Sequence, residues 1–597
     1  MTRTLMSMLI ALMIVLAACG GDGDTTEPAA DSGTTGDTGG DTDGDTGADE
    51  EDTGDTGDTS DAGAAPAEIT ILAEDIPAGL DYDGPSAAIP TSQTGMVNLQ
   101  EPLVYYRSAG TNDEGVGLLD FGFSDENFEG RLAESWSFDA ATLTWTFNLR
   151  QGVVGCSGET FTADDVVYTF ARAKSVSGAA PIGWFLSNVA SIDGFDTGVF
   201  SGEEGATDLG DEVVKIDDFT VEIRQSAQNK LFLPVLTIFG LGIFDKEMME
   251  ANATEEDPWS HDYANNVNSP SFGPYCLETW EKDNQFVVTA NPDYYLGAPD
   301  IDRIVYQKVP QSSNRLAAIQ SEDAQLVERL TPREFDSLAG NDSVDVLGVT
   351  GNDNLFIHMN FTIPPFDDPL IRQAVAHAID YDEIIRVGYF GNAVKWEGQV
   401  PASYPGYHRS DTQYDFDPDR ARQLLDDAGY ADDGSILLSY VAEKESTLGP
   451  IATLIQSNLA DVGINVQLDP LPQTQYGDRQ LVKKDLQFAL NDQEKPIGVD
   501  AGYATLLFFV STEAGGLNNM VNYTSATVDD LFSQLINEGD EATRNDLLAQ
   551  VQDTLQEDVA WLPVVERKTQ WALSPDLSGL VWHPDNSIRW ADLSFGG

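Results

Sequence analysis

The sequence predicts a mixed α/β fold, and three observations carry this prediction. Apolar and polar residues alternate over 143–150, the period of a strand with one buried face, and Thr162 then precedes a helix that begins with two acids. Two later helices begin at an Asp followed by a proline, at Asp368 and Asp417. Residues 451–466 predict a helix that runs into a strand. Elements in such alternation indicate α/β lobes.

Length and charge set further bounds. The 597 residues suffice for about three or four domains. The net charge is −69, and because residues 20–68 hold 16 acids and no Lys or Arg, most of the acidic excess lies in the rest of the chain. Such a charge repels phosphate backbones and anionic lipid head groups, so nucleic acid and the membrane surface are poor partners. The charge is also compatible with saline surroundings.

The chain opens with the pattern of an export signal. Arg3 precedes an apolar run over 5–16 that is too short to span a bilayer, so residues 1–18 are predicted to be a signal peptide. The Leu-Ala-Ala-Cys-Gly junction around Cys19 resembles the lipobox of bacterial lipoproteins, which implies cleavage before Cys19 and lipidation of its thiol. An ordinary secretory leader is the alternative. Both place the mature protein outside the cytoplasm.

A low-complexity tether follows the signal. Residues 19–67 repeat Asp, Gly and Thr with almost nothing apolar to bury, so we expect disorder and swelling by like charges. A flexible coil of about 48 residues reaches roughly 40 Å. Globular structure is predicted to begin with a strand near 68–72.

The next part of the chain favours strands. Residues 99–106 predict a helix or a strand edge, and the alternation over 213–223 predicts a strand. Residues 231–244 are apolar enough to be buried, and 285–289 predict another strand.

The later part of the chain favours capped helices. In the helix after Asp368, Leu370 and Val375 fall on one apolar face. The helix after Asp417 is expected to stop at Gly429, a residue suited to a left-handed C-terminal position. Residues 558–564 predict a late strand.

The pattern of chemically reactive residues gives little support to an enzyme. The five histidines form no spaced metal-binding set, and no nucleophile elbow, phosphate loop or Cys-x-x-Cys pair occurs. We therefore expect no catalytic residue, no cofactor and no metal. Once Cys19 is set aside, Cys156 and Cys276 remain, and an exported compartment allows them to pair, while two buried free thiols are the alternative.

Several sequence blocks resemble the extracytoplasmic solute-binding proteins of ABC importers in the dipeptide, oligopeptide and nickel class, bacterial family 5. The blocks are Leu-Ala-Glu-Ser-Trp at 132–136, Thr-Phe-x-Leu-Arg at 146–150, Thr-Ala-Asp-Asp-Val at 162–166, Gly-Pro-Tyr at 273–275 and Asn-Pro-Asp-Tyr-Tyr at 291–295. They occur in the family's order, and with the capped helices and late strand the resemblance covers roughly 69–594.

The resemblance implies a two-lobed periplasmic-binding-protein fold (class II, cluster C) with an extra small domain inserted in the N-terminal lobe. It implies the following segments: lobe I, 68–100, 224–308 and 566–597; inserted domain II, 101–223; lobe III, 309–565.

The resemblance also implies a function. The protein would capture oligopeptide or dipeptide-like solutes in a hinged cleft and deliver them to an ABC permease, as a monomer held to the membrane only by its lipid. Sugars and nickel chelates are other cargoes of relatives. An exported hydrolase or a signalling receptor with the same cleft are the alternatives.

The resemblance places candidate ligand-binding residues along the chain. Asp500 aligns by order with the acid that accepts the ligand's α-ammonium in peptide-binding relatives, although the usual Trp-x-x-Asp-Tyr context is missing. Aromatic residues are expected to line the cleft because they provide large apolar walls. The other candidates are Tyr503, Trp184, Phe185, Trp396 and Asn360.

Overall fold

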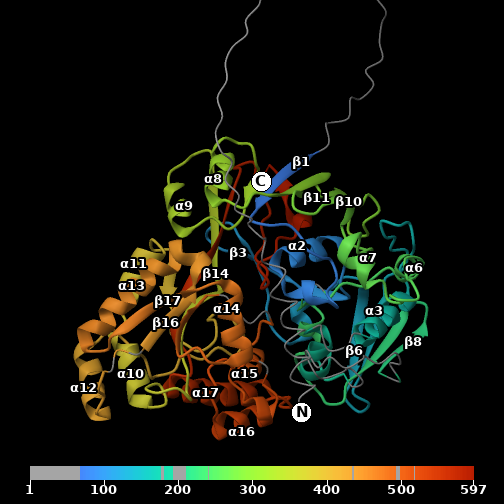
Figure 1. Ribbon diagram of the computed structural model, residues 1–597. Coiled ribbons are helices and arrows are strands. Elements are labelled where there is room, and N and C mark those ends of the chain that lie inside the picture. Colours follow the sequence, from blue (N-terminus) through green and yellow to red (C-terminus); the bar gives the residue numbers. More distant parts are fainter. Residues whose placement is uncertain are drawn as a thin grey trace, which may run out of the picture.

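The structure is a computed structural model (Figure 1). It describes residues 67–175, 181–192, 210, 212–238, 241–432, 434, 436–492, 498–516 and 518–596. The predicted signal peptide, Cys19 and nearly all of the tether lie outside the described residues.

One mixed sheet of eleven strands runs through the molecule in the order β10-β11-β12-β1-β13-β19-β14-β18-β16-β17, with β15 paired to β19. Parallel pairs such as β1 with β12 lie beside antiparallel pairs such as β14 with β19. The strands are β1 (Glu68–Ala73), β10 (Tyr275–Glu281), β11 (Gln285–Ala290), β12 (Arg303–Lys308), β13 (Leu326–Val327), β14 (Asp345–Met359), β15 (Ala393–Lys395), β16 (Ile436–Val441), β17 (Val466–Leu471), β18 (Phe488–Asn491) and β19 (Leu562–Leu573).

The smaller sheets lie mainly in the inserted part of the chain. A four-stranded antiparallel sheet has the order β6-β7-β9-β8, and three strand pairs accompany it. The four strands are β6 (Ala133–Asp139), β7 (Thr144–Leu149), β8 (Val213–Asp217) and β9 (Thr220–Arg224). The pairs are β2 (Val104–Tyr106) with β5 (Phe128–Gly130), β3 (Ser108–Thr111) with β4 (Gly117–Leu119), and β20 (Leu577–Ser578) with β21 (Ser594–Phe595).

Helices flank the sheets on both sides of the molecule (Figure 1). They are α2 (Pro90–Leu99), α3 (Ala163–Ser175), α4 (Pro181–Trp184), α5 (Phe232–Val235), α6 (Lys246–Ala251), α7 (His261–Asn266), α8 (Ser312–Gln320), α9 (Pro332–Ser337), α10 (Pro369–Ala378), α11 (Tyr381–Gly388), α12 (Pro418–Ala428), α13 (Glu445–Val462), α14 (Gln473–Gly477), α15 (Ala501–Phe508), α16 (Ala526–Leu535) and α17 (Glu541–Asp558). Short 3-10 turns occupy Pro85–Ala88, Asp125–Asn127, Ala442–Lys444, Thr512–Ala514 and Trp590–Asp592, and π-turns occupy Phe185–Val189 and Asp478–Lys483.

The predicted helix caps are present. Asp368 accepts a hydrogen bond from the amide of Leu370, and Asp417 accepts one from the amide of Arg420. Gly429 ends α12 with φ 64°, the left-handed conformation that glycine adopts without strain. The Thr162 hydroxyl accepts from the amide of Asp164 at the start of α3. Local side-chain chemistry therefore sets these helix boundaries.

Three predicted strands differ in extent. The stretch 213–223 is the hairpin of β8 and β9, because Asp218 and Phe219 turn the chain. Strand β7 begins at Thr144, since Leu143 has φ 55° and closes the turn before it. Strand β17 begins only at Val466, after Gly463 ends α13.

Packing divides the molecule into lobes. One apolar cluster contains only residues from 355 to 565, which we call lobe III. A separate cluster joins Leu72 of β1 with Ile319, Phe335 and Ala572. The segment 309–344 therefore packs with β1, and we propose that lobe III begins later than the predicted 309, at about 351. We refer to 101–224, which extends the predicted 101–223 by the last residue of β9, as domain II, and to the remainder of the described chain as lobe I.

Two long strands carry the chain between the lobes. Strands β14 and β19 pair with each other on both sides of an irregularity at 350–354 and 566–568. The space at the crossing is tight, because a Cβ on Gly351 would lie 2.4 Å from the Trp582 ring. The predicted boundary at 566 falls at this crossing.

Glu566, which lies at this crossing, is expected to make the stability of the folded protein depend on pH. Its side chain is buried, one oxygen accepts from the Ala402 amide at 2.8 Å, and burial raises the pKa to about 7 from an ordinary 4.5. The folded state therefore binds the proton more tightly, and Glu566 destabilises it increasingly as the pH rises from about 4.5 to 7. We expect Glu566→Gln to match the wild type in denaturant melts at pH 4, below both pKa values, and to exceed it in stability at pH 8. The exposed control Glu513→Gln should show no such difference; equal curves for Glu566→Gln and wild type at pH 8 would contradict the assignment.

Candidate functional site

A small pocket lies between lobe III and the segment that follows β9. It is a narrow hollow that is partly open to solvent. Lobe III lines one side with α15, α16 and α17, and the segment after β9 lines the other. We call it the interlobe pocket; its lining residues are Asn229, Lys230, Leu231, Gly502, Leu506, Phe532, Leu535, Ile536 and Arg544.

A buried ion pair supports the lobe III wall of this pocket. The guanidinium of Arg544 donates to both oxygens of Asp500, at 2.8 and 3.1 Å, and both side chains are less than 5% exposed. Asp500 also caps α15 by accepting from the amide of Tyr503 at 2.8 Å. The carboxylate predicted to receive a ligand ammonium is thus already neutralised within the protein, and Arg544 keeps further N–H donors beside the pocket.

Aromatic rings of domain II pack against lobe III. Phe185 of domain II and Tyr503 of lobe III, two of the predicted site residues, stack with ring centroids 6.1 Å apart. Arg544 lies 4.8 Å from the ring centroid of Phe123, which comes from domain II. The largest apolar cluster continues across this contact, from Phe185 to Ala501 and Leu548. The structure therefore presents the lobes in a closed arrangement.

Two predicted site residues have other roles. The Asn360 side chain is fully buried and completely bonded: its amide donates to the carbonyls of Lys484 and Leu486, and its oxygen accepts from Thr362. It joins two loops within lobe III and has no capacity left for a ligand.

Trp396 is also buried and is not among the residues that line the interlobe pocket. It is 3% exposed, donates its indole N–H to the Val400 carbonyl at 3.0 Å, and packs edge-on against Phe356. In this closed arrangement its burial and its hydrogen bond support the fold. The side chain of Trp184 lies outside the described residues, although the backbone of Trp184 belongs to α4.

Arg544, Phe123 and Lys230 are residues that the sequence analysis missed. Arg544 carried a usable signal, because it precedes Leu548, Val551 and Leu555 on the buried stripe of α17. A charged residue at an apolar position of an amphipathic helix indicates a buried partner.

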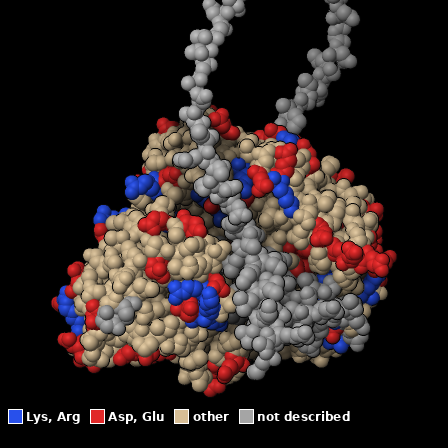
Figure 2. Space-filling model, viewed as in Figure 1, with Lys and Arg blue, Asp and Glu red and all other residues tan. Residues whose placement is uncertain are grey.

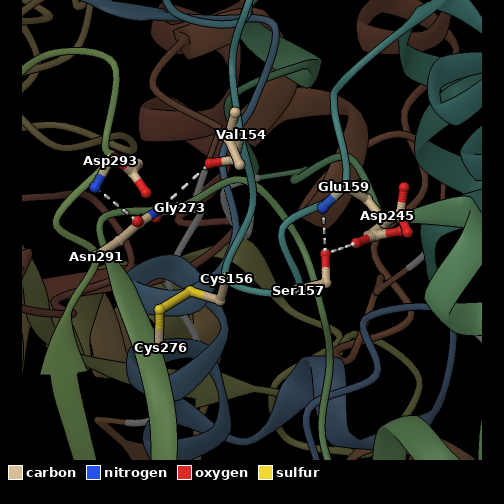
Figure 3. The surroundings of a disulfide bond; sticks show 9 residues. All are labelled: Val154, Cys156, Ser157, Glu159, Asp245, Gly273, Cys276, Asn291 and Asp293. Atoms are coloured by element: carbon tan, nitrogen blue, oxygen red, sulfur yellow. Dashed lines mark hydrogen bonds between the residues drawn. A yellow bond between two sulfur atoms is a disulfide. The ribbon is translucent and has the colours of Figure 1, made fainter.

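A disulfide joins domain II to lobe I. Cys156, in the loop after β7, bonds to Cys276 on the edge strand β10, with Cα atoms 5.6 Å apart (Figure 3). Beside it, Ser157 donates to Asp245 at the start of α6 (Figure 3). Of the two alternatives for these thiols, the structure contains the pair.

One acidic group near this loop has the spacing of metal ligands. Within the described part of the chain, one ligand oxygen from each of Asp165, Asp245 and Glu247 lies within 4.8 Å of the others. Asp165 and Asp245 already accept hydrogen bonds from backbone amides at the starts of α3 and α6. These acids therefore have a structural function at two helix ends.

None of the described helices has the length and apolar character needed to cross a membrane.

Two lobes joined by crossing strands, with a site at their interface, define a hinged binding protein. A sequence model of a known family, the bacterial extracellular solute-binding proteins, family 5 (middle region), matches residues 127–512, nearly two-thirds of the chain. The chain belongs to this family, which confirms the resemblance, the two-lobed α/β fold and the function of a solute-binding receptor.

Individual relatives agree with this assignment. The dipeptide-binding protein of Escherichia coli K12 is 26% identical over 493 residues, covering 80% of this chain and 88% of the relative. The glutathione-binding protein GsiB of the same strain is 25% identical over 478 residues, covering 79% and 87%. In fold, the chain is similar to DppA of Helicobacter pylori in complex with peptide STSA, with a TM-score of 0.70, 22% identity, and coverage of 89% of this chain and 99% of that one.

Proposed function

We propose that this receptor captures short peptides outside the cytoplasm and delivers them to an ABC permease. The names of the dipeptide-binding and glutathione-binding relatives support peptide-like cargo. Our comparisons favour this receptor role and give no support to an exported hydrolase. We further propose that Cys19 carries a lipid, that the tether separates the body from the membrane, and that the protein acts as a monomer.

The closed lobes explain how capture works without covalent chemistry. A solute in the interlobe pocket touches Leu231 and Lys230 on one side and α15 and α17 on the other. Only the closed form provides both sets of contacts, so a bound solute shifts the population toward closure.

The specificity that we propose depends on one observation, the buried ion pair between Asp500 and Arg544. Its carboxylate is occupied, so a free ammonium gains little from Asp500, whereas peptide carbonyls or a terminal carboxylate can accept from Arg544 and Lys230. The apolar walls Leu506, Phe532 and Ile536 accept side chains without specific contacts. We therefore propose that peptides bind through their acceptor groups.

Titration calorimetry with trialanine, N-acetyl-trialanine and trialanine amide tests this proposal. We expect N-acetylation to change the dissociation constant by less than about fivefold, because the carboxylate of Asp500 is already paired. If Asp500 were unpaired, N-acetylation would instead remove a charge-assisted contact worth about 1.5–3 kcal/mol. The dissociation constant would then rise roughly 10- to 150-fold. Failure of all three peptides to bind, with none retained in native mass spectra of the purified protein, would contradict peptide cargo.

A further inference from the structure

A charged group of lobe III lies against an aromatic ring of domain II. The guanidinium carbon of Arg544 stands over the Phe123 ring, 4.8 Å from its centroid. Arg544 belongs to α17, whereas the half-buried Phe123 lies in the loop that follows β4. The face of an aromatic ring carries partial negative charge and attracts a cation placed above it. The contact therefore joins two parts of the chain on opposite sides of the lobe interface.

The ring adds to the ion pair of Arg544 with Asp500 and does not displace it. Asp500 accepts hydrogen bonds from Nη1 and Nη2 of Arg544, at 3.1 and 2.8 Å. A ring face attracts the charge as a whole and needs no N–H of its own. Because Arg544 is only 3% exposed, water screens this attraction weakly. Such a desolvated contact is at the strong end of its kind.

Packing on both sides holds Phe123 in place. Two residues earlier, the Phe121 ring lies edge-on to Trp582, with centroids 5.5 Å apart. One residue later, the amide and the hydroxyl of Ser124 donate to Asn127 Oδ1 at 3.1 and 2.9 Å. These anchors restrict the loop before the lobes meet, so little conformational freedom is lost when Phe123 contacts lobe III.

The same anchor reaches the crossing of the long strands. The Trp582 ring lies so close to Gly351 that a Cβ there would stand 2.4 Å from it. Gly351 belongs to the irregular part of the pairing between β14 and β19. The loop of Phe121 and Phe123 is therefore mounted beside the crossing, and the separation of Phe123 from α17 follows the angle between the lobes.

We propose that the contact between Phe123 and Arg544 is a latch that stabilises the closed lobes before any solute binds. Opening keeps the pair of Asp500 and Arg544, because both residues belong to lobe III, but it removes the ring and exposes the guanidinium to water. The latch rests on the proposed closure of the lobes and does not depend on the cargo. It raises the apparent affinity for every solute alike, since less free energy is then needed for closure.

Energy transfer in the free, full mature chain tests the latch, with dyes at the exposed positions Ile216 of domain II and Phe416 of lobe III. Phe123→Leu keeps an apolar side chain without the ring, and we expect the ratio of closed to open molecules to fall about tenfold. Phe123→Tyr keeps the ring face, so its ratio should stay within about twofold of the wild type. Phe138→Leu removes a ring that packs on Trp145 within domain II and should leave the ratio unchanged.

Fluorinated phenylalanines at position 123 separate the effect of charge from that of apolar packing. Fluorine weakens the negative face of the ring, keeps the ring close to its original size and makes it more apolar. The closed fraction should therefore fall stepwise with increasing fluorination, whereas a purely apolar contact would keep or raise it. Incorporation through a second suppressor codon leaves the dye positions intact.

Any of three results would overturn the latch: no change along the fluorinated series, an unchanged ratio in Phe123→Leu, or a free protein without closed molecules. Melting curves establish whether Phe123→Leu folds, and the fluorinated series provides the test if it does not. Failure of trialanine to bind would contradict peptide cargo and leave this test intact, because the ratio is measured in the free protein.

Discussion

Removal of the Cys156–Cys276 disulfide is expected to lower the free energy of unfolding by about 5 kcal/mol. The bond closes a segment of 120 residues, and the entropy that such a link removes from the unfolded chain grows with the length of the loop. The closed segment contains β8 and β9, two strands of the four-stranded sheet of domain II, and ends in the edge strand β10. Without the bond, only the two chain connections near 101 and 224 and non-covalent contacts join domain II to lobe I.

Urea melts of wild type and of Cys156→Ser/Cys276→Ser, each with and without reductant, measure the effect. The reduced wild type should match the double variant, and limited proteolysis of both should begin within 101–224. Mass mapping without reductant should recover one peptide pair joined through these cysteines. Equal melts of oxidised and reduced wild type would contradict the assignment.

Asp500→Asn is expected to destabilise the protein by about 3–5 kcal/mol. The substitution leaves the guanidinium of Arg544 buried and without its partner, and an unpaired buried charge is among the most costly single changes. It also weakens the cap of α15, where Asp500 accepts from the Tyr503 amide. Arg544→Met should cost a similar amount, because it leaves the buried carboxylate of Asp500 unpaired.

Combining the two changes makes the test specific. The double variant Asp500→Asn/Arg544→Met removes both charges, so its loss should be smaller than the sum of the single losses. The exposed pair of Arg409 and Glu397 is the matched control, and Arg409→Met should leave the stability nearly unchanged, because solvent screens an exposed pair. A stable Asp500→Asn protein that no longer binds peptide would show instead that Asp500 is a ligand anchor.

Local chemistry explains which parts of the fold were predictable. The caps at Asp368 and Asp417 and the stop at Gly429 depend on neighbours within three residues, which the sequence displays directly. The family blocks gave the two-lobed architecture. The packing of 309–344 on β1 and Ala572 joins residues that are hundreds of positions apart, so the sequence shows no local signal for it near the predicted boundary at 309.

The candidate site was harder to predict from the sequence for the same reason. Asp500 and Arg544 are 44 residues apart, and only the folding of α15 against α17 brings them together. Asn360 and Trp396 were placed by order along the chain, which cannot distinguish a side chain that points into a cleft from one that is bonded inside a lobe. Phe185 and Tyr503 were both named, but their stacking across the lobes required the structure.

The body of the protein displays carboxylates on both lobes of the face in view (Figure 2). Exposed acids at this density keep the chain soluble and disfavour nucleic acid and anionic lipid.

Energy transfer between dyes placed at Ile216 of domain II and Phe416 of lobe III tests the central claim most directly. Both side chains are about half exposed, at 53% and 45%, so unnatural amino acids for labelling are tolerated there without disturbing the disulfide. The account predicts open and closed populations in the free protein and a shift toward the closed one at saturating trialanine, with the peptide recovered unchanged. One population that saturating peptide does not alter, or a peptide that is cleaved, would contradict it.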